Sequence, residues 1–254
     1  MDINLSGKTA IVTGATGQLG RTIARTLAQC GADVAVHYLN NRAMAAQLTE
    51  EITRMGRKAL AVQADVACKD SVDAMAETVI SALGAPQIAI NCAVSQYPWT
   101  SILEQDPQDY QDQFDTCVMH NVLMAKAFIP HMIKAQYGRF VGINTECVMQ
   151  CLPNQSAYVA GKRGMDGIYR ILAREVGMHG ITVNQVAPGW TISDRERESG
   201  GQAQPGLYRP RGVETAAAPT RKLPTSVAFL ASDLAAFITG VYLPVCGGYV
   251  MPAI

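Results

Sequence analysis

Residues 13–20 read Thr13-Gly14-Ala15-Thr16-Gly17-Gln18-Leu19-Gly20 and lie between a short apolar run and a segment of helical periodicity. Three glycines at a strand-to-helix turn permit a tight bend and let backbone N–H groups approach a pyrophosphate. The helix that follows adds its dipole and its first N–H donors. A glycine triplet alone is a weak signal, but at the first strand–helix junction of a βαβ unit it predicts a dinucleotide site.

Short apolar runs alternate with helical segments along the rest of the chain. The predicted strands cover residues 8–13, 33–38, 59–62, 88–90, 139–143, 181–186 and 241–245, and the predicted helices cover residues 21–30, 43–55, 71–83, 110–135, 157–178 and 227–230. Apolar strands separated by helices are typical of a parallel sheet that is covered on both faces. With right-handed crossovers, the pattern predicts an α/β fold, a doubly wound parallel sheet (Rossmann fold) with three α/β/α layers.

The organisation expected from this pattern is one dinucleotide-binding catalytic domain over residues 1–254. Residues 193–222 are rich in Gly, Pro, Arg and Glu and show no clear periodicity. A loop of that length in a compact domain is usually functional, so we expect a flap over the substrate there.

The composition argues against several classes of protein. The chain has 254 residues and no formal net charge, whereas a nucleic-acid-binding protein needs a basic surface. Its first residues do not resemble a signal peptide, and no apolar run approaches the ~20 residues that span a bilayer. Seven cysteines without a C-x-x-C pair favour reduced thiols in a cytoplasmic protein over disulfides or zinc. The four histidines show no metal-ligand spacing, so we expect no metal and only structural or surface roles for them.

The residues after the second predicted strand bear on the choice of cofactor. An acidic residue at this point usually binds the ribose hydroxyls of NAD. Here Tyr38 is followed by Leu39-Asn40-Asn41-Arg42, which contains no carboxylate to repel a 2′-phosphate. Because Arg42 could pair with that phosphate, the sequence favours NADP, with NAD as the alternative. An arginine that only begins a surface helix is an almost equally good interpretation.

Tyr158 and Lys162 begin a long predicted helix with a spacing of four, which puts them on one face, one turn apart. A phenol has a pKa of about 10 and is a poor base at neutral pH. A nearby ammonium group, together with a positive nicotinamide ring, favours the phenolate. Such a tyrosine could exchange a proton with an alcohol or a carbonyl while hydride moves.

Several segments in this order resemble the short-chain dehydrogenase/reductase family in its compact branch, over essentially the whole chain. The resemblance rests on residues 13–20, Asp65-Val66, Asn91-Cys92-Ala93, Asn121, residues 158–162, Pro188-Gly189 and residues 245–248. It implies an oxidoreductase that interconverts an alcohol and a carbonyl. It also implies a homotetramer with the predicted helices 110–135 and 157–178 at an interface.

The resemblance assigns a role to each matching residue. Tyr158 would be the general acid/base, Lys162 would hold the nicotinamide ribose and lower the pKa of the tyrosine, and Asn121 would hold a water that links Lys162 to solvent. Thr145 stands where the family normally has the serine that binds the substrate oxygen. The expected cofactor contacts are Gly14, Thr16, Gln18, Leu19, Asn40, Arg42, Asp65, Val66, Asn91, Ala93, Tyr158, Lys162, Pro188, Gly189, Thr191 and Ser193.

The chain departs from the family pattern at several positions, among them Cys92, where the family has an asparagine. Gln18 replaces the middle glycine of the turn, Val94 replaces a glycine, Thr145 replaces the serine, and Cys246 replaces an aspartate. These departures leave a second hypothesis open, in which the protein binds a nicotinamide dinucleotide with little catalysis, as a sensor or assembly partner.

The substrate pocket should form from the loops after the fourth, fifth and sixth predicted strands. Its candidate residues are Tyr97, Trp99, Glu146, Met149, Trp190 and the flap. The arginines of the flap favour a polar or anionic small molecule, such as a sugar, polyol, hydroxy acid or acyl thioester, although a solvated loop is the better interpretation of those charges.

Overall fold

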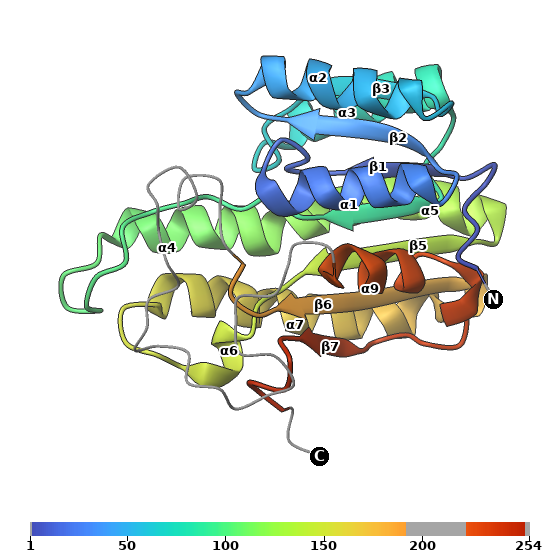
Figure 1. The fold of residues 1–254 in the computed structure, drawn as a ribbon. Helices are drawn as coiled ribbons and strands as arrows, with labels where there is room; N and C mark the ends of the chain where they lie inside the picture. The colour runs from blue at the N-terminus through green and yellow to red at the C-terminus, as the bar shows by residue number, and fades with distance from the viewer. Residues whose placement is uncertain (1, 192–221, 252–254) are drawn as a thin grey trace.

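The computed structural model describes residues 2–191 and 222–251. Within these ranges a seven-stranded parallel sheet has the order β3-β2-β1-β4-β5-β6-β7 (Figure 1). The strands are β1 (Thr9–Val12), β2 (Asp33–Tyr38), β3 (Ala59–Gln63), β4 (Ile88–Asn91), β5 (Gly138–Ile143), β6 (Ile181–Pro188) and β7 (Tyr242–Val245). The doubly wound parallel sheet that the sequence predicts is confirmed.

Helices cover both faces of the sheet (Figure 1). The described helices are α1 (Gln18–Gln29), α2 (Arg42–Arg54), α3 (Lys69–Leu83), α4 (Pro107–Phe114), α5 (His120–Ala135), α6 (Cys147–Gln150), α7 (Ser156–Val176) and α9 (Lys222–Leu230), with short turns at Asp115–Met119, Gly177–His179 and Asp233–Ala235. One hydrophobic cluster joins α1, α2 and α9 to the sheet, and a second joins α3, α5 and α7 to its other face. The molecule therefore has the three layers that the sequence predicts.

The central strands are buried along their whole length, which explains why apolar residues occur on both of their faces. Every residue of β1, β4, β5 and β6 is buried. Each large aliphatic side chain removed from water in this way contributes roughly 1.5–3 kcal/mol to folding. The two clusters on opposite faces therefore hold the sheet in place and align the carboxyl ends of its strands at one edge.

The largest difference from the expected elements concerns the helix predicted over residues 110–135. It begins earlier, at Pro107, because Asp106 caps it by accepting the N–H of Gln108 at 2.9 Å. It is also interrupted, since residues 115–119 form a π-helical turn between α4 and α5. A π turn adds one residue without changing the apolar pattern much, so sequence periodicity does not reveal it. The short helix α6 was likewise not predicted.

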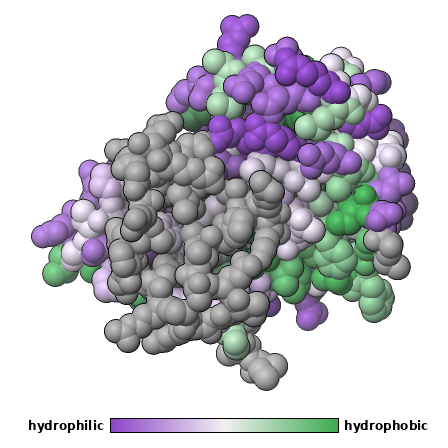
Figure 2. Space-filling view, viewed as in Figure 1, coloured by the Kyte–Doolittle hydropathy of each residue, from purple (hydrophilic) through white to green (hydrophobic). Residues whose placement is uncertain are grey.

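The surface gives two further observations. Among the described residues, no helix is both long and apolar enough to cross a membrane. Figure 2 shows hydrophilic side chains around α2 at the top of this face, and hydrophobic side chains gathered at the lower right, near α9 and the start of β7. Leu234 and Phe237, which follow α9, are exposed. The predicted flap at residues 193–222 lies outside the described residues, apart from Lys222 at the start of α9.

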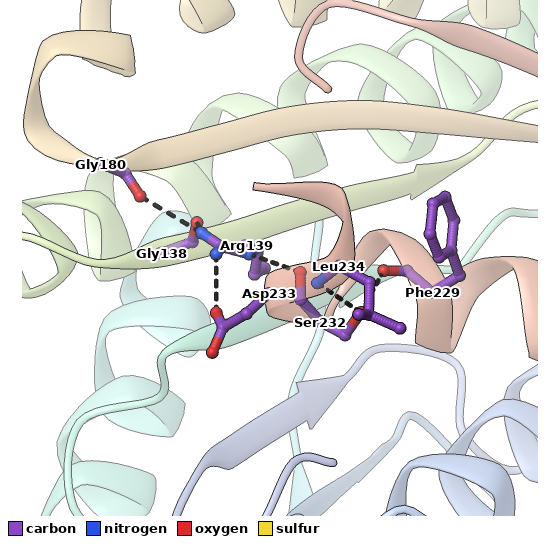
Figure 3. Close-up of polar contacts among 7 residues, drawn as sticks. All are labelled: Gly138, Arg139, Gly180, Phe229, Ser232, Asp233 and Leu234. Carbon is purple, nitrogen blue, oxygen red and sulfur yellow. Dashed lines mark hydrogen bonds and ion pairs between the residues drawn. The ribbon is translucent and has the colours of Figure 1, made fainter. Parts of the chain in front are cut away.

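A buried arginine stabilises the sheet at the amino ends of its strands (Figure 3). Arg139 in β5 is 3% exposed and donates to the carbonyls of Gly138 at 2.8 Å, Gly180 at 3.2 Å and Ser232 at 3.2 Å. Its Nη2 also donates to the carboxylate of Asp233 at 2.9 Å. One guanidinium therefore joins β5 to the turn before β6 and to the turn after α9.

We predict that Arg139→Met lowers the free energy of unfolding by about 3 kcal/mol, because buried carbonyls lose their donor. The matched control is Arg170→Met, which removes an exposed ion pair with Asp166 and should cost less than about 1 kcal/mol. Urea unfolding of both variants measures the difference. Equal losses in the two variants would show that the Arg139 contacts contribute no more than a surface pair.

Candidate active site

The turn between β1 and α1 has the geometry of an anion-binding site. Gly14 has φ +62°, and a Cβ there would lie 2.8 Å from Cα of Ala93. A Cβ on Gly20 would lie 2.2 Å from the carbonyl oxygen of Gly14. Gly17 precedes α1 and offers no side-chain cap to its first N–H groups. The glycines therefore keep the turn tight and leave the start of α1 to an incoming anion, which fits the pyrophosphate of a dinucleotide.

The side chain of His37 in β2 is hydrogen-bonded to the backbone of this turn. The N–H of Gly14 donates to Nδ1 of His37 at 2.9 Å, and Nε2 of His37 lies 3.0 Å from the carbonyl of Ala64. Because a carbonyl only accepts, the proton of the neutral ring belongs on Nε2. Burial lowers the pKa of His37 below its ordinary value and favours this neutral form. His37 is thus a structural residue, as expected, although its place beneath the phosphate turn was not predicted.

The four residues expected near the adenosine end lie just beyond the carboxyl ends of β2 and β3. Asn40 and Arg42 are exposed, and Arg42 is the first residue of α2. Asp65 is exposed and accepts the N–H of Ala67 at 2.9 Å, whereas Val66 is 6% exposed. An arginine and no carboxylate therefore stand at the end of β2.

Asn91 and Asn121 belong to one buried hydrogen-bonded group. Nδ2 of Asn91 donates to Oδ1 of Asn121 at 2.9 Å and to Oη of Tyr169 at 3.0 Å. Oη of Tyr169 donates to the same Oδ1 of Asn121 at 2.7 Å, and Nδ2 of Asn121 donates to the carbonyl of Cys117 at 2.6 Å. The hydrogen bonds of the Asn121 side chain therefore link β4, α7 and the π-helical turn.

Tyr158, Lys162 and Thr145 come together at the carboxyl edge, from α7 and from the residues after β5. Lys162 is 4% exposed, its Nζ donates to the carbonyl of Ile143 at 2.6 Å, and it lies 5.8 Å from the centroid of the Tyr158 ring. Thr145 is 5% exposed, and its Oγ1 accepts the N–H of Cys147 at 3.2 Å. The helical spacing predicted for Tyr158 and Lys162 is present.

The electrostatic surroundings of Tyr158 favour its protonated form in this structure. Burial raises the pKa of the phenol above its ordinary value of 10.0, and the Cys147 thiol adds to the rise, whereas hydrogen bonding with Thr145 opposes it. Lys162 is not among the main causes of this shift, in contrast to the lowering expected from sequence. A neutral phenol is a proton donor, so the arrangement is prepared to protonate an oxygen.

The residues expected beside the nicotinamide follow β6. The N–H of Gly189 donates to the carbonyl of Val245 at 3.1 Å, and Oγ1 of Thr191 donates to the carbonyl of Gly189 at 3.2 Å. Pro188, the last residue of β6, accepts the N–H of Glu146 at 3.1 Å. This segment therefore lies beside Thr145 and Tyr158. Ser193, the last expected contact, lies outside the described residues.

A cavity of about 680 Å³ opens beside Tyr158 and Thr145. Leu19 of the glycine turn and Pro188, Gly189 and Thr191 line it, so it borders the dinucleotide site. Of the candidate pocket residues, Tyr97, Trp99, Glu146 and Trp190 line this cavity, and Met149 does not.

The loop after β4 carries the aromatic wall of the cavity and is joined to α7. The N–H of Tyr158 donates to Oη of Tyr97 at 2.7 Å, and the Trp99 ring stacks on the Tyr158 ring with centroids 5.8 Å apart. Sequence analysis included Tyr97 and Trp99 among the pocket residues but missed these contacts, and it also missed Gln150 and Gln155 in the lining. The only signal for Gln155 was its position three residues before Tyr158, almost one helical turn away.

Comparison with known proteins agrees with this geometry. A family profile described as "Enoyl-(Acyl carrier protein) reductase" matches residues 14–250. The 3-oxoacyl-(acyl-carrier-protein) reductase FabG of Pseudomonas aeruginosa is 34% identical over 251 residues, which cover 98% of this chain and 100% of that protein. The protein of the same name from Staphylococcus epidermidis is 33% identical over 244 residues, which cover 96% of this chain and 99% of that protein.

Two solved structures share the whole fold. A 3-oxoacyl (acyl-carrier-protein) reductase from Agrobacterium tumefaciens with NADP bound has a TM-score of 0.88 at 25% identity, covering 97% of this chain and 96% of that one. A 7α-hydroxysteroid dehydrogenase in complex with NADH and 7-oxoglycochenodeoxycholic acid has a TM-score of 0.88 at 26% identity, with the same coverage.

His120 is a second buried histidine near the site. It is 1% exposed, its Nδ1 lies 3.1 Å from the carbonyl of Thr116, and its Nε2 has no hydrogen-bond partner among the described residues. Burial, together with the smaller effects of His37 and Lys162, lowers the pKa of His120 from 6.5 to about 3. Below pH 6.5 the unfolded chain therefore binds a proton that the folded protein does not, so stability falls as the pH falls.

We predict that His120 alone costs the protein about 2 kcal/mol of unfolding free energy between pH 7 and pH 5. His120→Asn should remove this part of the acid sensitivity, whereas His131→Asn, an exposed histidine on the same helix, should leave it unchanged. Urea unfolding at the two pH values measures both variants. The same pH dependence in His120→Asn and in the parent protein would contradict the prediction.

Proposed function

We propose that this chain, which belongs to the short-chain dehydrogenase/reductase family, is an NADP-dependent oxidoreductase that interconverts an alcohol and a carbonyl. The observation that carries the proposal is the position of one phenol. The half-buried side chain of Tyr158 lies at the carboxyl ends of the strands, with Thr145 and Lys162 around it, beside a cavity that borders the dinucleotide turn.

Each residue then has a chemical task. Tyr158 donates a proton to the carbonyl oxygen of the substrate, or takes one from the alcohol in the reverse direction. The Thr145 hydroxyl orients the same oxygen. The Lys162 ammonium, 5.8 Å from the phenol ring, would hold the ribose hydroxyls of a bound nicotinamide, the other role that the family resemblance implies. A bound nicotinamide ring supplies or accepts the hydride.

The preference for NADP rests on the end of β2. Arg42 at the start of α2 supplies a positive charge where a 2′-phosphate would lie, and Asn40 and Tyr38 before it carry no charge that would repel one. The two similar structures hold NADP in one case and NADH in the other, which supports a nicotinamide dinucleotide without selecting between the two.

We also propose that the protein is a homotetramer. Phe114 on α4 and Ile171 on α7 are 48% and 59% exposed, and Phe237 after α9 is fully exposed. Exposed apolar side chains on two separate faces suit two kinds of subunit contact, the first of them on the helices expected at an interface.

Replacement of the catalytic hydroxyl tests the central proposal. Tyr158→Phe should lower kcat/KM by about a thousandfold, since general acid catalysis is lost, while the Kd for NADPH, measured by fluorescence, stays the same. Tyr137→Phe, at the opposite edge of the sheet, is the matched control and should retain activity. Undiminished turnover in Tyr158→Phe would refute the acid/base assignment and favour the hypothesis of a binding protein with little catalysis.

The cofactor preference has a separate test. Arg42→Ala should raise the Kd for NADPH about tenfold, because one charge-assisted contact to the phosphate is lost, and should leave the Kd for NADH unchanged. Arg54→Ala, at the exposed end of the same helix, should change neither. An equal effect on both cofactors would mean that Arg42 does not read the 2′-phosphate.

A further inference from the structure

The described lining of the cavity beside Tyr158 is rich in carboxamide side chains. It includes four carboxamide side chains, those of Gln96, Gln150, Asn154 and Gln155. Four aromatic residues and several hydroxyl groups stand beside them, whereas the described lining contains no lysine or arginine. Carboxamides and hydroxyls both donate and accept hydrogen bonds without carrying charge.

Two of these carboxamides have unused hydrogen-bonding atoms. Gln155 is 7% exposed, and its Oε1 is buried without a hydrogen-bond partner among the described residues. Nε2 of Gln150 is buried and unpartnered in the same way. A buried polar atom left without a partner destabilises the protein, so such atoms beside a cavity indicate a ligand that completes them. Because one atom accepts and the other donates, a hydroxyl group can satisfy either.

Trp99 supplies a flat apolar surface next to the proposed acid. Its ring stacks on that of Tyr158 with an interplanar angle of 27°, yet it remains 48% exposed. The loop that carries it is held by Gln105, whose Oε1 accepts from the N–H and the hydroxyl of Thr100 at 3.0 Å. A fixed indole face suits the C–H face of a hydroxylated carbon chain or ring. The hydroxyl groups of such a ligand then point to the carboxamides of the lining.

Other classes of substrate fit this lining less well. A carboxylate, a phosphate or a coenzyme A thioester calls for arginine or lysine, and the described lining contains neither. A steroid calls for a continuous apolar wall, which the carboxamides interrupt. Resting on the proposed oxidoreductase function, we propose that the substrate is an uncharged polyhydroxylated compound, a polyol or the corresponding keto sugar. Of the substrate classes that the sequence suggests, this proposal favours sugars and polyols over hydroxy acids and acyl thioesters.

A panel of matched compounds tests the substrate class. With NADP⁺, the oxidation of xylitol, glucitol and inositol is compared with that of gluconate, cyclohexanol and a hydroxysteroid, and with NADPH the reduction of xylulose is compared with that of acetoacetyl coenzyme A. Inositol and cyclohexanol share a ring and differ in their hydroxyl groups, and glucitol and gluconate differ in charge. We expect kcat/KM for the best neutral polyhydroxylated compound to exceed that for every other class at least about tenfold.

Variants of the lining connect this preference to the residues named. Gln155→Leu and Gln150→Leu should each raise the KM for the preferred polyol about tenfold with a smaller change in kcat. Gln29→Leu, at an exposed position at the end of α1, is the matched control. The Kd for NADPH of each variant shows that it is folded and that the cofactor site is intact.

The outcomes separate the two proposals. A higher kcat/KM for an acid, a thioester, a steroid or a simple alcohol would overturn the substrate class and leave the oxidoreductase function standing. An unchanged KM for the polyol in both glutamine variants would likewise overturn the assigned recognition. If NADPH bound but no compound of any class turned over, the substrate class and the proposed function would both fall.

Discussion

The close contact between the glycine turn and the loop after β4 is the constraint on which the site depends. β1 lies in the middle of the sheet, with β2 on one side and β4 on the other, so the chain reverses its winding direction here. The hydroxyl of Thr13 accepts the N–H of Cys92 at 2.9 Å, and the absence of a Cβ on Gly14 lets the turn approach Ala93. A crevice at the carboxyl ends of the strands follows from this topology.

The amino and carboxyl ends of the strands contribute differently to the protein, the first to stability and the second to the candidate site. At the amino edge, Arg139 satisfies buried carbonyls from three segments and contributes to stability. At the carboxyl edge, buried polar groups such as Lys162 and Thr145 surround the Tyr158 phenol, whose pKa burial raises. Burying polar side chains lowers the stability of a protein. Several of them gathered beside one cavity therefore indicate a functional site and not only a structural hydrogen-bond network.

Sequence reasoning was most effective where the chemistry is local. The spacing of Tyr158 and Lys162 is a property of one helix, and the apolar runs of β1, β5 and β6 reflect burial on both faces, so both could be read directly. The π-helical turn before α5 and the short helix α6 were missed, because neither leaves a distinct apolar pattern.

The sequence by itself determined the parallel sheet, the glycine turn and the spacing of Tyr158 and Lys162, because hydrophobic period and helical spacing are encoded in neighbouring residues. Only the tertiary structure decided what surrounds them. It put His37 against Gly14, Trp99 against Tyr158, and Gln150 and Gln155 in the lining of one cavity, each with one buried amide atom that has no hydrogen-bond partner among the described residues. These contacts join residues that are distant along the chain or in different loops. Their meeting depends on the packing of whole elements, which no local pattern specifies.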